Sequence, residues 1–143
     1  MKNKILFPVL TILVLILSAC SFPMTGNVVK VKDTGNSPLV PYLVDTNGKT
    51  LYIYTKDTPN TSNCYGACAV TWPPLLTSVV PVAGSDLKAS FLDRTQRTDG
   101  SLEQITYNGW PLYYYSGDNA AGDTNGENIN EAWFVISPDG VKR

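Results

Sequence analysis

Histidine is absent from the 143-residue chain. Histidine is the commonest acid–base catalyst near neutral pH and the commonest metal ligand, so its absence argues against most chemistry of those two kinds. A serine or cysteine nucleophile would have no histidine base. Gly-rich phosphate loops of the P-loop or dinucleotide type are also missing. The sequence therefore predicts a protein that is not an enzyme and carries no cofactor.

Clusters of basic residues are missing as well. Lys2 and Lys4 precede Cys20, which leaves nine basic against twelve acidic side chains from Cys20 onward. Nucleic acids and anionic membrane faces attract concentrated positive charge. Neither is expected as an electrostatic partner of this chain.

The apolar run at the N-terminus, Ile5–Leu17, is too short to cross a membrane. It has thirteen residues, whereas a helical span needs about 20. Two lysines before the run and small residues after it are typical of a secretory signal. The residues that follow, Leu17-Ser18-Ala19-Cys20, resemble the lipobox of bacterial lipoproteins, in which the cysteine carries a diacylglyceryl group and cleavage falls just before it.

This N-terminal pattern predicts the organisation of the chain. We expect a signal peptide at 1–19, lipidation at Cys20, a short tether at 20–27 and one domain at 28–143. Two or more acyl chains hold a protein stably at a bilayer. The expected location is extracytoplasmic, anchored by lipid in the cell membrane or the outer membrane. An ordinary secretory signal is the alternative.

Two cysteines remain once the expected anchor is subtracted. An even pair in an exported protein favours a disulfide, so Cys64 and Cys68 are expected to be bridged. The alternative is a redox dithiol or a copper site. Redox motifs usually place their cysteines with two intervening residues at a helix start. The three residues between this pair favour a structural bridge.

Short runs of strand-forming residues follow the tether and are cut by turn signals. The runs are Val28–Lys32, Val40–Val44 and Leu51–Tyr54. Asn47-Gly48 lies between the last two and predicts a hairpin with a type I′ turn, which needs positive φ at both residues. No stretch of ten residues has a helical period, although a single helical turn around 67–71 is compatible with the pattern.

The sequence aligns with itself at an offset of 61 residues. Seven identities keep this offset without a gap: Asn47-Gly48 with Asn108-Gly109, Leu51-Tyr52 with Leu112-Tyr113, Tyr54 with Tyr115, Asp57 with Asp118, and Trp72 with Trp133. An internal duplication explains them. Repeat one then covers about 28–82 and repeat two about 89–143.

The duplication predicts the fold. At the same offset, second-repeat strands are expected at 89–93 and 101–105. Each repeat would hold about four strands, the fourth beginning at its tryptophan and returning beneath its own repeat. We therefore expect an all-β domain of about eight short strands, folded as a small antiparallel sandwich or barrel with approximate two-fold symmetry.

Several motifs now give a family resemblance. They are Tyr-x-aromatic-x-x-Asp at 52–57 and 113–118, Cys-Tyr-Gly-Ala-Cys-Ala at 64–69, Trp-Pro-Pro-Leu at 72–75, Arg-Thr-Asp-Gly at 97–100 and Tyr-Asn-Gly-Trp-Pro-Leu at 107–112. In this order they resemble the secreted-repeat lipoprotein family, which is named for the first motif. The resemblance implies an all-β secreted repeat in a lipoprotein and implies no activity. Only the first copy carries the cysteines.

The repeated aromatic residues allow two interpretations. Tyr52 and Tyr54 lie on one face of their strand, and Tyr113 and Tyr115 repeat the arrangement. They could form a platform that stacks on a sugar ring or another flat ligand. The favoured interpretation is that the tyrosine rings fill the core and their hydroxyls form hydrogen bonds at its rim. Trp72 and Trp133 are likewise expected to be core residues.

The repeated aspartates also allow two interpretations. Asp57 and Asp118 stand where the third strand enters a long loop, which favours a turn in which the carboxylate accepts backbone N–H groups. The alternative is a cation site, because calcium takes six to eight oxygens. Its weak candidate ligands lie in the second loop: Asp118, Asp123, Asn125 and Glu127. Their spacing is not that of a standard calcium loop.

Taken together, these patterns predict a lipid-anchored envelope protein that acts as a non-enzymatic binding or interaction module. Its partner would be the membrane through the anchor and an unidentified envelope protein or glycan. The alternatives are an envelope redox protein that uses Cys64 and Cys68, and a cation- or carbohydrate-binding accessory protein.

Overall fold

The structure is a computed structural model that describes residues 28–33, 41–100 and 102–142. The expected signal peptide (1–19), the lipidation site Cys20 and the tether (20–27) lie outside the described residues. Within the described part of the chain, no helix is long and apolar enough to cross a membrane.

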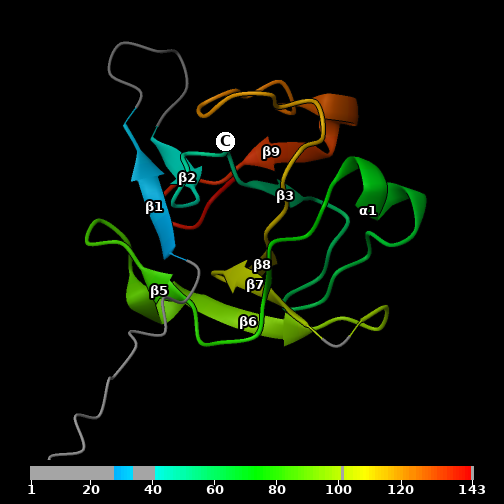
Figure 1. Cartoon of the computed structure of the whole chain (residues 1–143), viewed down its shortest axis with the longest axis horizontal. Coiled ribbons are helices and arrows are strands. Elements are labelled where there is room, and N and C mark those ends of the chain that lie inside the picture. Colours follow the sequence, from blue (N-terminus) through cyan, green and yellow to red (C-terminus); the bar gives the residue numbers. More distant parts are fainter. Residues whose placement is uncertain (1–27, 34–40, 101, 143) are drawn as a thin grey trace, which may run out of the picture.

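Strands dominate the described residues (Figure 1). They are β1 (Val28–Lys32), β2 (Tyr42–Val44), β3 (Tyr52–Tyr54), β4 (Leu76–Thr77), β5 (Val82–Ala83), β6 (Leu92–Gln96), β7 (Glu103–Tyr107), β8 (Trp110–Pro111) and β9 (Trp133–Val135). The helical elements are α1 (Ala67–Thr71) and two 3₁₀ turns, η1 (Ala89–Phe91) and η2 (Ile129–Glu131). The predicted all-β class is confirmed, and α1 occupies the predicted helical turn.

Three small sheets make up the body. Their strand orders are β2-β1-β5, β3-β9 and β4-β7-β6, with β8 added on β7. Every named pair among the described strands is antiparallel except β1 with β5. In Figure 1, β3 and β9 lie above β6, β7 and β8, and β1 lies at the opposite side from α1.

The two repeats exchange strand partners. β3 of repeat one pairs with β9 of repeat two, so that Tyr54 lies opposite Trp133. In the reciprocal place, Tyr113 of repeat two forms a bridge with Pro74 of repeat one. Trp133 begins β9 as predicted, but the prediction that each tryptophan begins a strand beneath its own repeat is wrong for the pairing of β9 and for Trp72. Trp72 follows α1 instead of starting a strand, and Pro73-Pro74 lacks the N–H groups that a ladder needs.

Two second-repeat strands lie later in the chain than predicted. The expected strands at 89–93 and 101–105 are observed as β6 and β7, and η1 covers most of the first expected range. The cause is a different offset in this part of the chain. When the pairing Val31–Leu43 is matched to Arg94–Ile105, β6 follows β1 by 63 residues and β7 follows β2 by 62 residues. The offset of 61 holds only from the Asn-Gly hairpins onward.

The two Asn-Gly turns differ. Asn108 and Gly109 both have positive φ, at 49° and 81°, as a type I′ turn requires. In the first pair only Gly48 does, at 79°, so the type I′ prediction is wrong there. The Asp45 carboxylate accepts the Asn47 N–H at 2.8 Å and also the Lys49 N–H, which stabilises a different turn.

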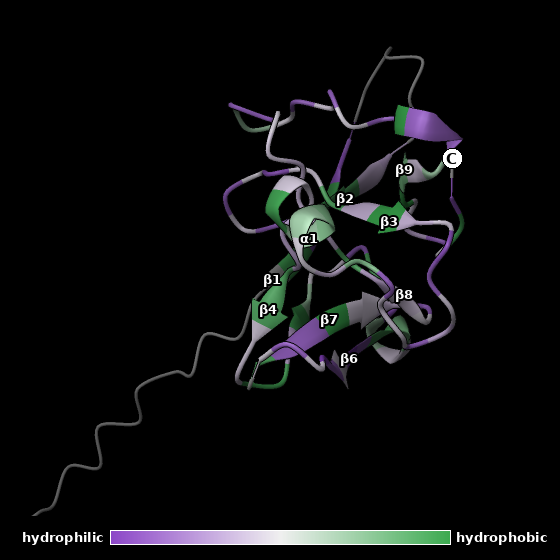
Figure 2. Ribbon diagram, turned by 90° about the vertical axis from the view of Figure 1, so that its right-hand side faces the viewer, coloured by the Kyte–Doolittle hydropathy of each residue, from purple (hydrophilic) through white to green (hydrophobic). Residues whose placement is uncertain are grey.

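The strands divide two apolar clusters. One is built from Val29, Leu43, Leu51, Ile53, Leu75, Ile105, Tyr107, Leu112 and Ile136. The other is built from Tyr42, Val44, Tyr52, Cys64, Trp72, Tyr113, Ala132, Trp133 and Val135. The predicted alternation along 51–54 is confirmed, because Leu51 and Ile53 enter the first cluster whereas Tyr52 enters the second. Figure 2 shows the apolar colour of α1 at the outer surface, and α1 has no buried residue.

Candidate functional site

The repeated tyrosines and aspartates bind each other across the two repeats. The Tyr52 hydroxyl donates to Asp118 Oδ2 at 2.8 Å, and the Tyr113 hydroxyl donates to Asp57 Oδ2 at 2.7 Å. Each tyrosine thus finds its carboxylate in the opposite copy. We call these two hydrogen bonds the clasps. All four side chains are buried, and both tyrosines are 0% exposed.

The second oxygen of each carboxylate holds a loop. Asp57 Oδ1 accepts the Asn63 N–H at 2.7 Å, and Asp118 Oδ1 accepts the Asn125 N–H at 2.9 Å. The turn interpretation of these aspartates is confirmed. In addition, each carboxylate joins the start of its own long loop to a tyrosine of the other repeat, which the sequence did not indicate.

A backbone bridge sets the clasps close together. The Tyr52 N–H donates to the Tyr113 carbonyl at 2.8 Å, and the Tyr113 N–H donates to the Tyr52 carbonyl at 3.0 Å. Equivalent residues of the two copies therefore lie face to face, as they would on the axis of a symmetric dimer. Neither ring presents a face to solvent, so neither forms a ligand platform.

Four aromatic rings stack through the second cluster. Trp72 and Trp133 lie parallel, with ring centroids 3.9 Å apart and planes 2° apart. Tyr54 stacks on Trp133 at 4.2 Å, and Tyr115 packs on Trp72 at 4.4 Å. Each outer tyrosine belongs to the repeat opposite its tryptophan. The tryptophans are core residues, as favoured from the sequence, and the half-buried Tyr54 and Tyr115 cap the ends of the stack.

Each long loop also reaches the other repeat's hairpin. The Asn60 N–H donates to the Gly109 carbonyl at 2.8 Å, and the Gly122 N–H donates to the Gly48 carbonyl at 2.9 Å. Asn60 and Gly122 both have positive φ, which asparagine and glycine tolerate best. Each kind of contact between the repeats, namely strand pairing, clasp, ring stacking and loop-to-hairpin bond, therefore occurs twice, once from each repeat to the other.

Burial controls the ionisation of the clasps. Burial raises the pKa of Asp57 to about 6, against the opposing effect of the Asn63 and Tyr113 hydrogen bonds. Burial also raises the pKa of both clasp tyrosines and of Asp118. The hydroxyls stay protonated at neutral pH and remain donors to the carboxylates.

A stability gain on mild acidification follows from Asp57. Its folded pKa of about 6 lies above the ordinary value of 3.8, so the folded state binds the proton more tightly and the free energy of unfolding rises as pH falls through this range. Asp118 and Glu127 act in the same direction because burial raises both pKa values, whereas Arg97 lowers the pKa of Asp99 and opposes them.

We therefore expect the protein to melt at a higher temperature at pH 5 than at pH 7.5. The gain should be about 1–2 kcal/mol, or several degrees in Tm, measured by circular dichroism. The Asp57→Asn variant keeps a side-chain acceptor for the loop N–H and should lose most of the gain. A Tm that falls between pH 7.5 and pH 5, or an unchanged slope in the variant, would contradict this.

The predicted disulfide is present between Cys64 and Cys68, with the Cα atoms 5.2 Å apart. Cys64 is 0% exposed and belongs to the aromatic cluster, whereas Cys68 is half-buried in α1. Closing this five-residue ring restricts the unfolded chain by about 2 kcal/mol. The bond fastens α1, which has no buried residue of its own.

Arg97 is a buried residue that the sequence reasoning missed. It is 3% exposed, and its five N–H donors all have acceptors: both Asp99 carboxylate oxygens, Ser62 Oγ, Gln104 Oε1 and the Cys64 carbonyl. Ser62 Oγ lies 2.7 Å from the Tyr113 hydroxyl, which links the guanidinium to the clasp at Asp57. The Arg-x-Asp spacing was the available signal.

A hollow of about 380 Å³ opens beside α1. It is lined by Ala69, Pro74, Leu76, Arg97, Asp99, Gly100 and Leu102. Most of these side chains are apolar, and Leu102 is 42% exposed at the edge. The bidentate pair of Arg97 with Asp99 fixes one wall. Neither the hollow nor its residues were predicted.

The weak cation candidates hold the second loop together. The Asp123 carboxylate accepts the Asn119 and Ala120 N–H groups, and Glu127 accepts the Val135 N–H at 2.7 Å. The Asn125 side-chain amide donates to the Gly117 carbonyl. In the described ranges, no three acidic or cysteine side chains converge as metal ligands would.

The fold and the site define a class: an all-β pair of repeats in which each copy completes the other. A family model described as a secreted repeat of unknown function matches residues 40–76 and 94–137, which together exceed half of the chain. The chain belongs to this family, and membership indicates an extracytoplasmic location. Searches of curated proteins and of solved structures found no match.

Proposed function

We propose that this protein is a lipid-anchored module of the bacterial cell envelope that binds a partner without catalysing a reaction. The anchor rests on the Leu17–Cys20 lipobox and the preceding signal-like segment. Membership of a secreted family supports the extracytoplasmic setting.

The internal use of the repeated polar groups carries the non-enzymatic part of the proposal. The clasps consume the tyrosine hydroxyls and the aspartate carboxylates, and the loop carboxylates accept backbone N–H groups. These groups are thus unavailable to a substrate. The recurring motif has a structural role inside the domain. A binding surface is therefore expected where the two copies differ.

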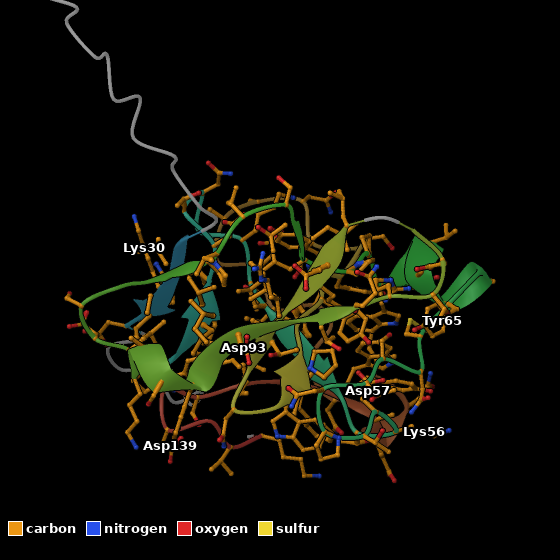
Figure 3. The ribbon with its side chains drawn as sticks, turned by 90° about the horizontal axis from the view of Figure 1, so that it is seen from below. Lys30, Lys56, Asp57, Tyr65, Asp93 and Asp139 are labelled. Atoms are coloured by element: carbon orange, nitrogen blue, oxygen red, sulfur yellow. A yellow bond between two sulfur atoms is a disulfide. The ribbon has the colours of Figure 1, made fainter. Side chains whose placement is uncertain are left out.

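The hollow beside α1 is the surface that suits recognition. It lies between the repeats, lined by Ala69, Pro74 and Leu76 of the cysteine-bearing repeat and by Arg97, Asp99, Gly100 and Leu102 of repeat two. Both α1 and Leu102 expose apolar side chains there. In Figures 1 and 3, β1 with Lys30 lies at the opposite side of the body from α1 and Tyr65. The chain enters the domain through β1, so an anchor at Cys20 leaves the hollow free to face away from the membrane.

Replacing Cys20 with alanine tests the anchor. Without the thiol no thioether to lipid can form, so the variant should leave the membrane fraction and lose labelling by a fatty-acid analogue. The wild-type N-terminus should be an acylated Cys20 in mass spectrometry. Cleavage at another bond, or an unmodified cysteine, would overturn the lipoprotein assignment.

Substituting the rim of the hollow tests recognition. Leu102→Asp should reduce, several-fold, the complexes captured by chemical cross-linking in intact cells. Val82→Asp is the matched control, because Val82 is 49% exposed in β5, away from α1. Equal complexes in both variants would exclude the hollow as the binding surface. If electron transfer that requires Cys64 and Cys68 is found instead, the envelope redox alternative replaces this proposal.

A further inference from the structure

The contacts between the repeats form a self-complementary interface. Strand pairing, clasp, ring stack and loop-to-hairpin bond each occur twice, with the roles of the copies reversed. A surface that meets its own equivalent in this way has the geometry of an isologous dimer. Each repeat therefore presents a surface whose complement is another repeat, whichever chain carries that repeat.

The connection between the repeats is attached to the body by few contacts. Residues 78–91 join β4 to β6, and none of them is buried. Val80 and Val82 are 70% and 49% exposed. The contacts of this connection with the body include the two-residue pairing of β5 with β1 and a Gly84 N–H bond to the Val29 carbonyl. At its end, half-buried Leu87 and Phe91 pack on the first apolar cluster, and the Phe91 carbonyl accepts the Asn108 N–H. Releasing the segment before Leu87 leaves the strand pairs, clasps, stacked rings and loop-to-hairpin bonds between the repeats in place.

The connection is also long enough to pass between two bodies. Fourteen residues extend to about 46–50 Å at 3.3–3.6 Å each. A domain of this size has a radius of gyration of roughly 13 Å. An opened connection thus reaches from one pair of repeats to a neighbouring pair.

We propose that two copies of this chain associate by exchanging repeats, so that repeat one of each chain packs on repeat two of the other. All clasps, stacked rings and strand pairs re-form between the chains, and only the path of residues 78–91 changes. Exchange of identical elements in this way is a low-cost route to a dimer. A flexible connection gives intrachain pairing an effective concentration in the millimolar range, so the exchanged fraction rises with protein concentration during folding.

Two variants, each with one added cysteine, detect the exchange in the full chain. Thr55 and Ala132 come from different repeats, and the Thr55 N–H donates to the Ala132 carbonyl at 2.8 Å. They continue the antiparallel register of β3 with β9. Residues opposite each other in such a ladder have Cα atoms about 4.5–5.5 Å apart, within the range of a disulfide.

The experiment mixes a Thr55→Cys chain with an Ala132→Cys chain, each also carrying Cys20→Ser. The mixture is unfolded in denaturant with Cys64–Cys68 kept oxidised, refolded at increasing concentration and then oxidised. We expect a disulfide-linked species of twice the chain mass, whose yield rises with concentration and whose bridge maps to positions 55 and 132. The related pair Thr71→Cys and Ser116→Cys, where the Ser116 N–H donates to the Thr71 carbonyl, should behave alike.

Two controls decide the result. The Thr55→Cys/Ala132→Cys double variant in one chain should bridge internally and show that the geometry permits the bond. A sample of only Thr55→Cys chains should give no disulfide-linked dimer, because position 55 of one chain meets position 132, not position 55, of the other. If the double variant bridges while the two-chain mixtures stay monomeric at every concentration, repeat exchange is excluded.

Discussion

Alanine at Trp72 or at Trp133 is expected to lower the free energy of unfolding by about 3–5 kcal/mol. Each indole is at least 96% buried and stacks on the other and on a tyrosine of the opposite repeat. A domain of this size has roughly 5–15 kcal/mol of stability in total, so either change should leave a marginal fold. Urea denaturation followed by circular dichroism measures the loss.

Trp110→Ala is the matched control for the stack. Trp110 lies half-buried in β8 and belongs to the other apolar cluster, so its loss should cost less. Two parallel indoles at 3.9 Å also couple their excited states, which gives an exciton couplet in circular dichroism. Trp72→Phe and Trp133→Phe should each abolish the couplet, whereas Trp110→Phe should keep it. A couplet that survives in both stack variants would contradict the geometry.

The local elements of the first repeat were predictable because they depend on local chemistry. The run Val28–Lys32 is rich in valine, alternates valine and lysine from Val29 onward, and forms β1 over the predicted range. The predicted turn around 67–71 forms α1. By contrast, β4 and β5 are two-residue strands whose partners lie far away in the sequence. Such short strands leave no periodic signal, because tertiary packing selects them.

The site was predictable in its residues but not in its pairing. Self-alignment shows that Tyr52 corresponds to Tyr113 and Asp57 to Asp118, yet it carries no information on whether a contact lies within or between copies. The short Tyr-x-aromatic-x-x-Asp spacing suggests a local arrangement, and the structure instead bonds each tyrosine to the distant aspartate. Arg97 escaped because its acceptors come from three separate segments, and only its bond with Asp99 is local.

The clasps should show energetic coupling between repeats rather than within the motif. Tyr113→Phe removes the hydroxyl that donates to Asp57 Oδ2. Asp57 is only 6% exposed, so water cannot readily replace the lost donor. A buried acceptor left without its donor costs about 1–3 kcal/mol. Tyr52→Phe should have a similar cost, because Asp118, like Asp57, keeps one backbone N–H donor and loses its hydroxyl donor.

Double-mutant cycles measured by urea denaturation distinguish the two pairings. Tyr113→Phe combined with Asp57→Asn should be non-additive by about 0.5–3 kcal/mol, because both changes act on one hydrogen bond. Tyr113→Phe combined with Asp118→Asn should be additive to within about 0.5 kcal/mol, even though these residues share one motif. The reciprocal cycles built on Tyr52 should show the opposite preference, with coupling to Asp118 and little to Asp57. Coupling confined to residues of the same repeat would mean that the clasps do not cross, and the exchanged architecture would have to be abandoned.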